Sequence, residues 1–475
     1  MENWTVAGIV YALFEIVGVL SGMHALLNGR TPQGTIAWLF FLVTLPFLAV
    51  PLYWVFGPRR YSDYIDARLR TDTPFDGVVD GLRSAGEPFI VDRDEAPHMV
   101  VALERLVRLP FLHGNDADLL VDGDTTFDAI LQAIDDAEDY VLLQFFIVRA
   151  DAIGTELGRR LRAAVERGVR VCFLYDEIGS RKLSVAYIRG LRHAGAELRS
   201  FSTTRRAHRL QLNFRNHRKL VVVDGNVALL GGLNVGVEYR GEHSRLSPWR
   251  DTFMRVHGPI VQALQLSFLE DWHWATDDVP DWNWAPRAAP SGESRWMLAL
   301  PTGPADALET CSLVFIALIH GARERLWIAT PYFVFDAQIT TALQAAALRG
   351  VDVRILVPAN GDSPAPFYAG WSFYDEVLES GCRILEYREG FMHQKVVLVD
   401  DRHAMVGSAN LDNRSMRLNF ELGVLVEDAA FTAEVEAMLE ADFERARDVG
   451  RGDFRKKGLW FRLGARTARL FAPVL

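Results

Sequence analysis

The sequence predicts an α/β protein in which two duplicated α/β/α domains face each other across a pseudo-two-fold axis, preceded by an N-terminal transmembrane helical hairpin. Two long apolar stretches open the chain, strand-like and helix-like segments alternate through the remainder, and one arrangement of segments occurs twice. A chain of 475 residues is too long for one ordinary domain, and its 49% hydrophobic content is sufficient for a sizeable core.

The two N-terminal apolar stretches cover residues 4–27 and 36–56. Each has about the ~20 residues that a helix needs to cross a bilayer. Pro32 and Gly34 between them indicate a tight turn, so residues 1–57 are predicted to form the hairpin. A cleaved signal peptide fits less well, because no basic segment precedes the first stretch and a second span follows at once. A buried core hairpin is the remaining alternative.

The basic residues around the hairpin predict its orientation. Arg59, Arg60, Arg68 and Arg70 follow the second stretch, whereas the loop between the stretches holds only Arg30. Because basic residues favour the inner side of a membrane, we expect a multi-pass protein whose remaining chain lies in the cytoplasm.

The rest of the chain contains a strand–helix–strand pattern twice, and the helix ends in Arg-Gly-Val in both copies. The first copy is expected at 139–148, 154–167 and 168–176, and the second at 326–334, 337–349 and 350–358. The first domain is predicted at 116–285 and the second at 286–450. Residues 58–115 form a connector of unassigned role, and 275–294, rich in Pro, Asp and Trp, form the linker.

Composition excludes several other kinds of site. The net charge of −10 gives no overall attraction to nucleic acid. Cys172, Cys311 and Cys382 lie far apart, which argues against a disulfide framework or a zinc cluster. We expect all three to be small core residues, with a reactive thiol as the less favoured alternative. No cluster of metal ligands is visible, and neither a metal nor another cofactor is expected.

Each copy also carries one His-x-Lys-x-x-x-x-Asp motif. The six residues proposed for the catalytic constellation are His217, Lys219 and Asp224, and His393, Lys395 and Asp400. Residues two apart in a strand share a face, so each histidine and its lysine are predicted to point into a common pocket. The aspartates have the opposite parity and are predicted to close the strand in a turn. One such match is weak evidence, whereas two with equal downstream spacing are strong; two core histidines on duplicated strands are the alternative.

A glycine-containing segment ends in asparagine 17 residues after each motif histidine, at Asn234 and Asn410. We expect the glycines to allow a ligand to approach the backbone, and the asparagines to donate to a phosphoryl oxygen. Asp251 and Glu421, each at the start of a later apolar strand, are candidates for the acids that orient the histidines. Ordinary surface carboxylates are the alternative.

Two facing histidines suit phosphoryl transfer. One attacks phosphorus as the nucleophile, while the other protonates the leaving oxygen and then deprotonates the incoming hydroxyl. The lysines and asparagines neutralise charge on the phosphoryl oxygens, so the chemistry needs no metal.

The paired motifs resemble those of the phospholipase D superfamily and, within it, the bacterial cardiolipin synthases. The resemblance is carried by Asn213–Lys219, Trp249–Asp251, Thr330–Phe333, Gly407–Ser415 and Asn419–Glu421. It implies transfer of a phosphatidyl group between two phosphatidylglycerol molecules through a phosphohistidine, giving cardiolipin and glycerol in the cytoplasmic membrane of a bacterium. The chain departs from the family pattern at Gln144–Phe146, where a tyrosine is common, and at Pro301–Pro304, which bears on substrate preference.

Two further segments suggest contact with anionic lipid. Arg215 ends a basic run that suits an anionic headgroup, with a solvated loop as the alternative; the rest of the run is Arg205, Arg206, His208 and Arg209. Residues 451–475 mix basic and apolar residues and predict an interfacial amphipathic helix, with a partner-docking or core helix as the alternative.

Other functions use the same motifs. A phospholipase D hydrolase and another phosphatidyltransferase, such as a phosphatidylserine synthase, share the histidine chemistry and stay open. The apolar N-terminus and the acidic charge weigh against a nuclease, and the two intact motifs weigh against a scaffold with a dead site. The sequence leaves a homodimer open.

Overall fold

The computed structural model describes residues 2–29, 32–57, 74–93, 96–202, 214–242 and 245–475. Contacts divide the chain into an N-terminal unit, which holds the first three helices, and an α/β unit, which holds both motifs. The basic residues on which the orientation and the headgroup run were predicted lie outside the described residues, with the exception of Arg215; they are Arg30, Arg59, Arg60, Arg68, Arg70, Arg205, Arg206, His208 and Arg209.

The N-terminal unit consists of α1 (Glu2–Asn28), α2 (Pro32–Thr44) and α3 (Pro46–Phe56). Within α1, Gly8–Asn28 is long and apolar enough to cross a membrane. Both shorter helices pack against α1. Polar side chains are paired inside the unit, since His24 Nδ1 lies 2.6 Å from the Tyr53 hydroxyl. The first predicted span is therefore present as one helix.

The second predicted span, 36–56, is wrong as a continuous helix. The chain leaves the helical conformation at Leu45, with φ −139° and ψ 58°, and α3 starts at Pro46. Proline disfavours the helical conformation of the residue before it and lacks the N–H that would continue the helix. The hairpin therefore consists of one long helix and two short ones.

The α/β unit contains two halves built from matching elements. The first half comprises β1 (Leu112–Val121), α7 (Asp122–Asp135), β2 (Tyr140–Phe145), α8 (Ala152–Glu166), β3 (Arg170–Asp176), α9 (Val185–Ala194), β4 (Glu197–Phe201), β5 (Arg215–Asn216), β6 (Leu220–Val223), β7 (Val227–Gly231), η2 (Val237–Arg240), β8 (Trp249–Arg250), β9 (Thr252–His257) and α10 (Ile260–Thr276). The second half comprises β10 (Arg295–Thr302), α11 (Thr310–Gly321), β11 (Arg325–Ala329), β12 (Phe333–Val334), α12 (Ala337–Leu348), β13 (Asp352–Pro358), α13 (Pro364–Leu378), β14 (Arg383–Tyr387), β15 (Phe391–Met392), β16 (Val396–Val399), β17 (His403–Gly407), β18 (Leu411–Asp412), α14 (Asn413–Arg417), β19 (Asn419–Glu427), α15 (Ala429–Glu444) and β20 (Ala446–Asp448).

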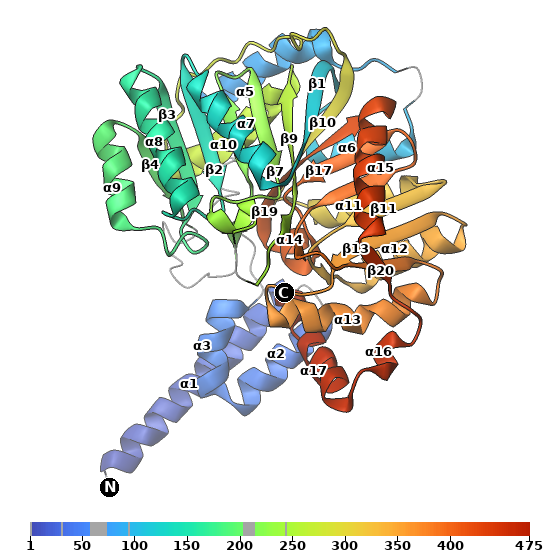
Figure 1. Cartoon of the computed structure of the whole chain (residues 1–475). Helices are drawn as coiled ribbons and strands as arrows, with labels where there is room; N and C mark the ends of the chain where they lie inside the picture. Colours follow the sequence, from blue (N-terminus) through green and yellow to red (C-terminus); the bar gives the residue numbers. More distant parts are fainter. Residues whose placement is uncertain (1, 30–31, 58–73, 94–95, 203–213, 243–244) are drawn as a thin grey trace. The chain divides into compact units, whose positions relative to one another are not determined.

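The sheet order shows the duplication directly. The strands run β20-β14-β13-β11-β16-β17-β19-β10-β1-β9-β7-β6-β2-β3-β4, so the order outward from β10 repeats the order outward from β1. These two central strands are antiparallel, as a two-fold relation requires. Helices cover both faces of the sheet, so each half is a three-layer α/β/α sandwich and the two halves share one continuous sheet (Figure 1).

Local signals are also duplicated. Asp151 caps α8 by accepting a hydrogen bond from Gly154 N–H, and Asp336 caps α12 in the same way. Gly168 and Gly350, in the two Arg-Gly-Val sequences, have φ of +94° and +92°. Only glycine adopts this conformation without strain, so it ends each helix where the next strand begins.

Part of the expected connector belongs to the α/β unit. It contains α5 (Pro74–Gly86), η1 (Glu87–Phe89) and α6 (His98–Val107), and β1 already starts at Leu112. The helix α6 packs against α11, and its Met99 and Leu103 are buried in the core of the second half. At the other end of the chain, α16 (Asp453–Lys456), α17 (Leu459–Arg469) and η3 (Ala472–Val474) follow β20.

Candidate active site

Each motif histidine follows a short strand that pairs with the other half of the molecule. β5 pairs in parallel with the start of β19, and β15 pairs in parallel with β8. His217 N–H donates to the Phe420 carbonyl at 2.9 Å, and His393 N–H donates to the Arg250 carbonyl at 2.7 Å. Both motifs are thereby fixed at the junction of the two halves, and each lies beside the other half's acid, because Glu421 is in β19 and Asp251 directly follows β8.

This pairing exchanges the acids between the halves. His217 Nδ1 lies 2.9 Å from Glu421 Oε2, and His393 Nδ1 lies 2.8 Å from Asp251 Oδ2. A carboxylate only accepts, so Nδ1 of His217 carries the proton and Nε2 of the neutral ring keeps the lone pair. Nδ1 of His393 lies 2.8 Å from Lys395 Nζ as well as 2.8 Å from Asp251, and the Asp251 contact favours the same tautomer. A histidine in this state is suited to attack phosphorus or to accept a proton.

The histidines are buried, which determines their protonation. Burial lowers the pKa of His217 to about 4, against the opposing effect of Glu421. Burial and then Lys395 lower the pKa of His393, although Asp251 acts to raise it. Both rings are therefore held as neutral bases at neutral pH.

The lysines respond to the same burial. Burial lowers the pKa of Lys395 to about 8, and it lowers the pKa of Lys219 well below the usual value. Lys395 also lowers the pKa of both Lys219 and His217 across the junction. These positively charged groups therefore repel one another across the junction, and an anionic ligand bound between them would relieve the repulsion.

The acids stay ionised although they are buried. Burial acts to raise the pKa of Glu421, but His217 and Lys219 outweigh it and hold the pKa at about 2. Burial also opposes ionisation of Asp251, whose pKa is lowered by Lys395 and His393. Each histidine therefore has a permanent anion on Nδ1, which stabilises the positive charge that develops when Nε2 forms a bond.

An aromatic ring lies beside each histidine, and the sequence analysis did not assign it to the site. Phe146 lies edge-on to His217 with ring centroids 5.1 Å apart, and Tyr332 lies edge-on to His393 at 6.4 Å. The Tyr332 hydroxyl donates to Asp362 Oδ2 at 2.7 Å. Both aromatics were visible in the sequence just after the first strand of each copy, Phe146 in Gln144–Phe146 and Tyr332 in Thr330–Phe333, although they do not occupy equivalent positions in the two copies.

The glycines of the downstream segments do not make room for a ligand, so that expectation is wrong. A Cβ on Gly232 would lie 2.1 Å from Asp251 Oδ1, and one on Gly407 would lie 2.7 Å from Gly423 Cα. These glycines allow close packing of Asp251, the residue before β9, and of β19, the strand that carries Glu421. Their role is to position Asp251 and Glu421.

The asparagines at the ends of these segments are buried and engaged with protein. Asn234 Nδ2 donates to the Tyr239 hydroxyl at 3.1 Å, and its Oδ1 accepts from Ile147 N–H. Asn410 Nδ2 donates to Asp412 Oδ2 at 3.0 Å. Donation from Asn234 or Asn410 to a phosphoryl oxygen remains a prediction.

The motif aspartates are turn residues, as predicted. Asp224 and Asp400 have φ of +52° and +55°. The Asp224 carboxylate accepts from the backbone N–H groups of 138–140, and the Asp400 carboxylate from those of 323–325. Each therefore joins the end of its own strand to the start of the neighbouring one and does not reach the reacting atoms.

Arg215 lies in β5 close to charged residues that the sequence analysis did not single out. Burial lowers the pKa of Arg215, and Asp176 and Arg414 act on it with opposite signs. Burial likewise lowers the pKa of Arg414. Arg414 lies inside the motif Gly407–Ser415, which was the signal available for it.

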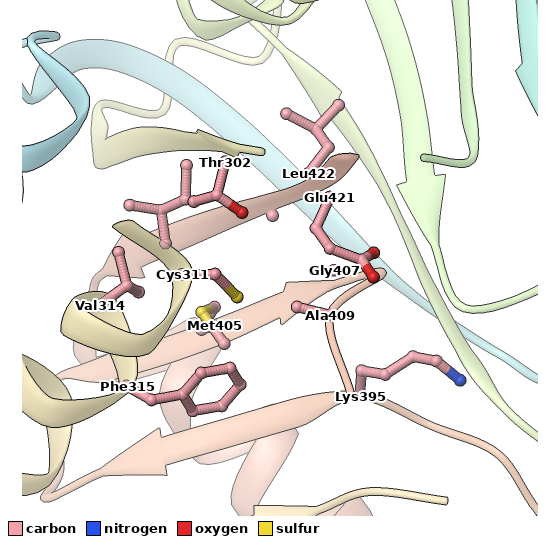
Figure 2. Close-up of a pocket in the computed structure, with 12 residues that line it drawn as sticks. Thr302, Cys311, Val314, Phe315, Lys395, Met405, Gly407, Ala409, Glu421 and Leu422 are labelled. Atoms are coloured by element: carbon pink, nitrogen blue, oxygen red, sulfur yellow. The ribbon is translucent and has the colours of Figure 1, made fainter. Parts of the chain in front are cut away.

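A small cavity lies behind the second half of the site. Figure 2 shows Lys395 and Glu421 at one end of it and Val314 and Phe315 at the other. Cys311 lines its wall, and burial raises the pKa of that thiol. Cys172, Cys311 and Cys382 are all buried and free, which confirms the prediction of core cysteines. Within the described residues, no group of three or more His, Cys, Asp or Glu side chains is arranged to hold a metal ion.

Comparison with known proteins adds to this geometry. The family described as "Cardiolipin synthase, PLD-like domain" matches residues 130–246 and 315–443, which are the two halves of the site. The chain belongs to this cardiolipin synthase family. A phospholipase D-nuclease N-terminal family matches residues 7–58.

Curated cardiolipin synthases match over the whole chain. Cardiolipin synthase A of Pseudomonas putida (strain GB-1) is 44% identical over 472 residues, covering 98% of both chains. Cardiolipin synthase A of Pseudomonas aeruginosa (strain UCBPP-PA14) is 44% identical over 479 residues, covering 100% of this chain and 97% of its own. The resemblance to cardiolipin synthases is confirmed, and the chain is a membrane-associated phosphatidyltransferase of this family.

A solved structure shares the fold. The crystal structure of phosphatidylserine synthase from Haemophilus influenzae Rd KW20 superposes with a TM-score of 0.62 at 16% identity, covering 80% of this chain and 100% of its own. At that identity the likeness concerns the fold alone.

Proposed function

We propose that the junction between the halves is one phosphatidyl-transfer site that converts two phosphatidylglycerol molecules into cardiolipin and glycerol. The observation that carries the proposal is the exchange of acids: His217 is oriented by Glu421, and His393 by Asp251. Neither half provides an oriented histidine alone, so both motifs must act together.

The transfer takes place in two displacements. In the first, the anionic phosphodiester stabilises a proton on Nε2 of one motif histidine, which is otherwise neutral. Nε2 of the other histidine forms a bond to phosphorus, the bond from phosphorus to the glycerol oxygen breaks, and the protonated histidine gives its Nε2 proton to that oxygen and becomes neutral. In the second, the neutral histidine takes a proton from the terminal hydroxyl of another phosphatidylglycerol. That oxygen bonds to phosphorus as the nitrogen–phosphorus bond breaks. Lys219 and Lys395 offset the negative charge on the other phosphoryl oxygens.

The test is purified full-length protein supplied with phosphatidylglycerol labelled in its headgroup glycerol. We expect one labelled glycerol for each cardiolipin formed, and a covalent phosphatidyl-protein adduct with the acid lability of a phosphohistidine. His217→Ala and His393→Ala are each expected to abolish both products while the protein still inserts into membranes. Phosphatidic acid as the main product would identify a hydrolase instead, and activity retained by either variant would refute the single shared site.

The proposed orientation places the α/β unit on the cytoplasmic side of a multi-pass N-terminal unit, with anionic lipid as the surrounding surface. The arginines that follow the second apolar segment support it. A fluorescent-protein fusion at the C-terminus should fluoresce in cells, whereas an alkaline phosphatase fusion at the same place should be inactive. The reverse result would overturn the orientation.

A further inference from the structure

The helix α17 exposes a continuous apolar face. Leu459 and Leu463 lie one turn apart on the helix with Trp460 beside them, and Leu470 and Phe471 follow directly after its last residue. Trp460 is 82% exposed and Leu470 is 78% exposed. Elsewhere in the described α/β unit, large exposed apolar residues such as Leu308 and Leu348 lie singly, which is ordinary for a protein surface. Five large exposed apolar side chains within one short C-terminal segment, three on α17 and two directly after it, indicate a binding surface.

The opposite face of α17 is already packed on α13. Ala465 is fully buried, and the Phe461 ring lies 5.0 Å from Tyr368 and 5.8 Å from Trp371. Arg469 forms an ion pair with Glu376 of α13. The helix is therefore held in place by its inner face, and its outer apolar face is not required for that packing.

Basic residues border the exposed face. Arg462, Arg466 and Arg469 lie on consecutive turns along one edge, and Arg451, Arg455, Lys456 and Lys457 precede the helix. Asp453 is the one acid among residues 451–475, although the whole chain has a net charge of −10. This otherwise acidic protein therefore has a local excess of positive charge beside its exposed apolar helix.

We infer that the outer face of α17 docks on the surface of an anionic phospholipid bilayer. An apolar face bordered by arginines matches an interfacial helix, in which apolar side chains enter the acyl boundary and basic ones contact lipid phosphates. A second copy of the chain fits less well, because a two-fold interface would bring the basic edge of one α17 against that of the other.

The docking surface is connected to the active site through α13. Phe367, near the start of α13, lines a small cavity together with Pro331 and Tyr332. Tyr332 in turn lies beside His393. Docking of α17 therefore fixes the position of the second half of the site relative to the lipid surface. The inference goes beyond the proposed transfer reaction and would hold for any lipid substrate.

The test uses full-length protein in which Leu463→Cys carries an environment-sensitive fluorophore. The three native cysteines are buried, so the label attaches to the new one. Leu348→Cys, at a leucine that is 76% exposed at the end of α12, is the matched control. Both proteins are reconstituted in vesicles of phosphatidylcholine, with or without an equal part of phosphatidylglycerol, that carry a quencher in the acyl chains.

In anionic vesicles, we expect the label at 463 to shift to the blue and to be quenched about twofold or more, while the label at 348 stays in water. Arg462→Glu with Arg466→Glu should reverse the effect at 463, as should high salt. Equal exposure of both labels in anionic vesicles would overturn the docking. A blue shift without acyl-chain quenching would place protein on the face and would overturn it as well. Because these readouts do not depend on catalysis, they stay informative whether or not the transfer reaction is correct.

Discussion

Glu421 and Asp251 occupy equivalent places in the two half-sheets, yet their surroundings differ. The Glu421 carboxylate accepts from Ser408 Oγ at 2.5 Å and Ser415 Oγ at 2.7 Å, in addition to His217. The Asp251 carboxylate accepts from the backbone N–H of residue 252, from His393 and, at 3.4 Å, from Trp249 Nε1, and the position that corresponds to Ser408 is a glycine. The same orienting contact is thus supported by hydroxyl groups in one half and by close backbone packing in the other.

A second difference lies one layer behind the histidines. Buried Asp271 on α10 pairs with Arg218, the residue between His and Lys of the first motif, at 2.8 Å. Buried Asp442 on α15 has the equivalent place, but the second motif has Gln394 there, and Arg250 from β8 supplies the positive charge at 2.8 Å. In both halves an arginine neutralises the buried carboxylate, but the arginine comes from the motif itself in the first half and from β8 in the second. The duplication therefore preserves charge balance rather than residue identity.

The largest expected effect comes from the orienting acids. Glu421→Gln and Asp251→Asn should each lower kcat by roughly 10²–10⁴-fold, because a neutral amide favours the wrong histidine tautomer and does not stabilise its positive charge. Glu421→Gln should also lower the thermal midpoint more than Asp251→Asn, since more hydroxyl donors lose their anionic acceptor. Transfer assays and thermal unfolding of the purified proteins measure both quantities.

The conservative changes Glu421→Asp and Asp251→Glu are the controls. They keep the charge and alter its distance, so they should retain more activity than the amides. Full activity in either amide variant would show that its histidine does not need an oriented tautomer, and the two halves would then not be equivalent in mechanism.

The sequence predicted the histidine–lysine pairs and both acids, but it did not reveal which acid serves which histidine. The spacing from His217 to Asp251 and from His393 to Glu421 lies within each half, and it suggests pairing inside the half. The actual pairing follows from contacts between β5 and β19 and between β8 and β15, which join residues far apart in sequence. Local patterns carry no information on such long-range pairing.

Other differences have local causes that were present in the sequence. The break before α3 follows from Pro46, whereas Pro51 remains inside that helix. Hydrophobicity alone does not show a break, since the segment is apolar on both sides of the proline. The role of Gly232 depends on the Asp251 carboxylate next to it, which sequence spacing does not place.

The buried ion pairs provide the next prediction. Arg218→Gln leaves Asp271 as an uncompensated buried charge and should destabilise the protein by about 3–5 kcal/mol. Gln394→Ala, the matched change in the second half, should cost only about 1–2 kcal/mol, because Arg250 still pairs with Asp442. Thermal and denaturant unfolding in detergent measure the difference.

A double variant tests this difference between the two halves further. Phe420 in β19 corresponds to Arg250 in β8, so adding Phe420→Arg to Arg218→Gln rebuilds the arrangement of the second half in the first. Partial recovery of stability is expected. A double variant that is no more stable than Arg218→Gln would show that the two carboxylates are not compensated in equivalent ways.

The lysines make a prediction about pH. Lys395 has a pKa of about 8, so it keeps its proton below that pH and loses it as the pH rises. Its loss removes a positive charge from the phosphoryl oxygens, so kcat/KM should fall up to about tenfold per pH unit above pH 8. In Lys395→Arg the guanidinium stays protonated, and this alkaline limb should move to higher pH even though overall activity drops. An unchanged limb would assign it to another group, with Lys219 the first to examine.

The smallest expected effect concerns the aromatic rings, where the halves differ by one hydroxyl. Tyr332→Phe leaves a phenyl ring beside each histidine, as Phe146 already is in the first half, and removes the hydrogen bond to Asp362. That bond orients the ring beside His393 but does not reach the reacting nitrogen, so its loss of about 1 kcal/mol should appear as a change of less than about tenfold, mainly in KM. Steady-state kinetics with phosphatidylglycerol separate KM from kcat.

A loss of more than about 100-fold in kcat would mean that the hydroxyl takes part in proton transfer, because an orienting contact of that strength does not account for it. In that case Phe146→Tyr, which adds a hydroxyl beside His217, should change kcat in the direction opposite to Tyr332→Phe. Comparing kcat of the two variants would then show whether the two histidines have different chemical roles.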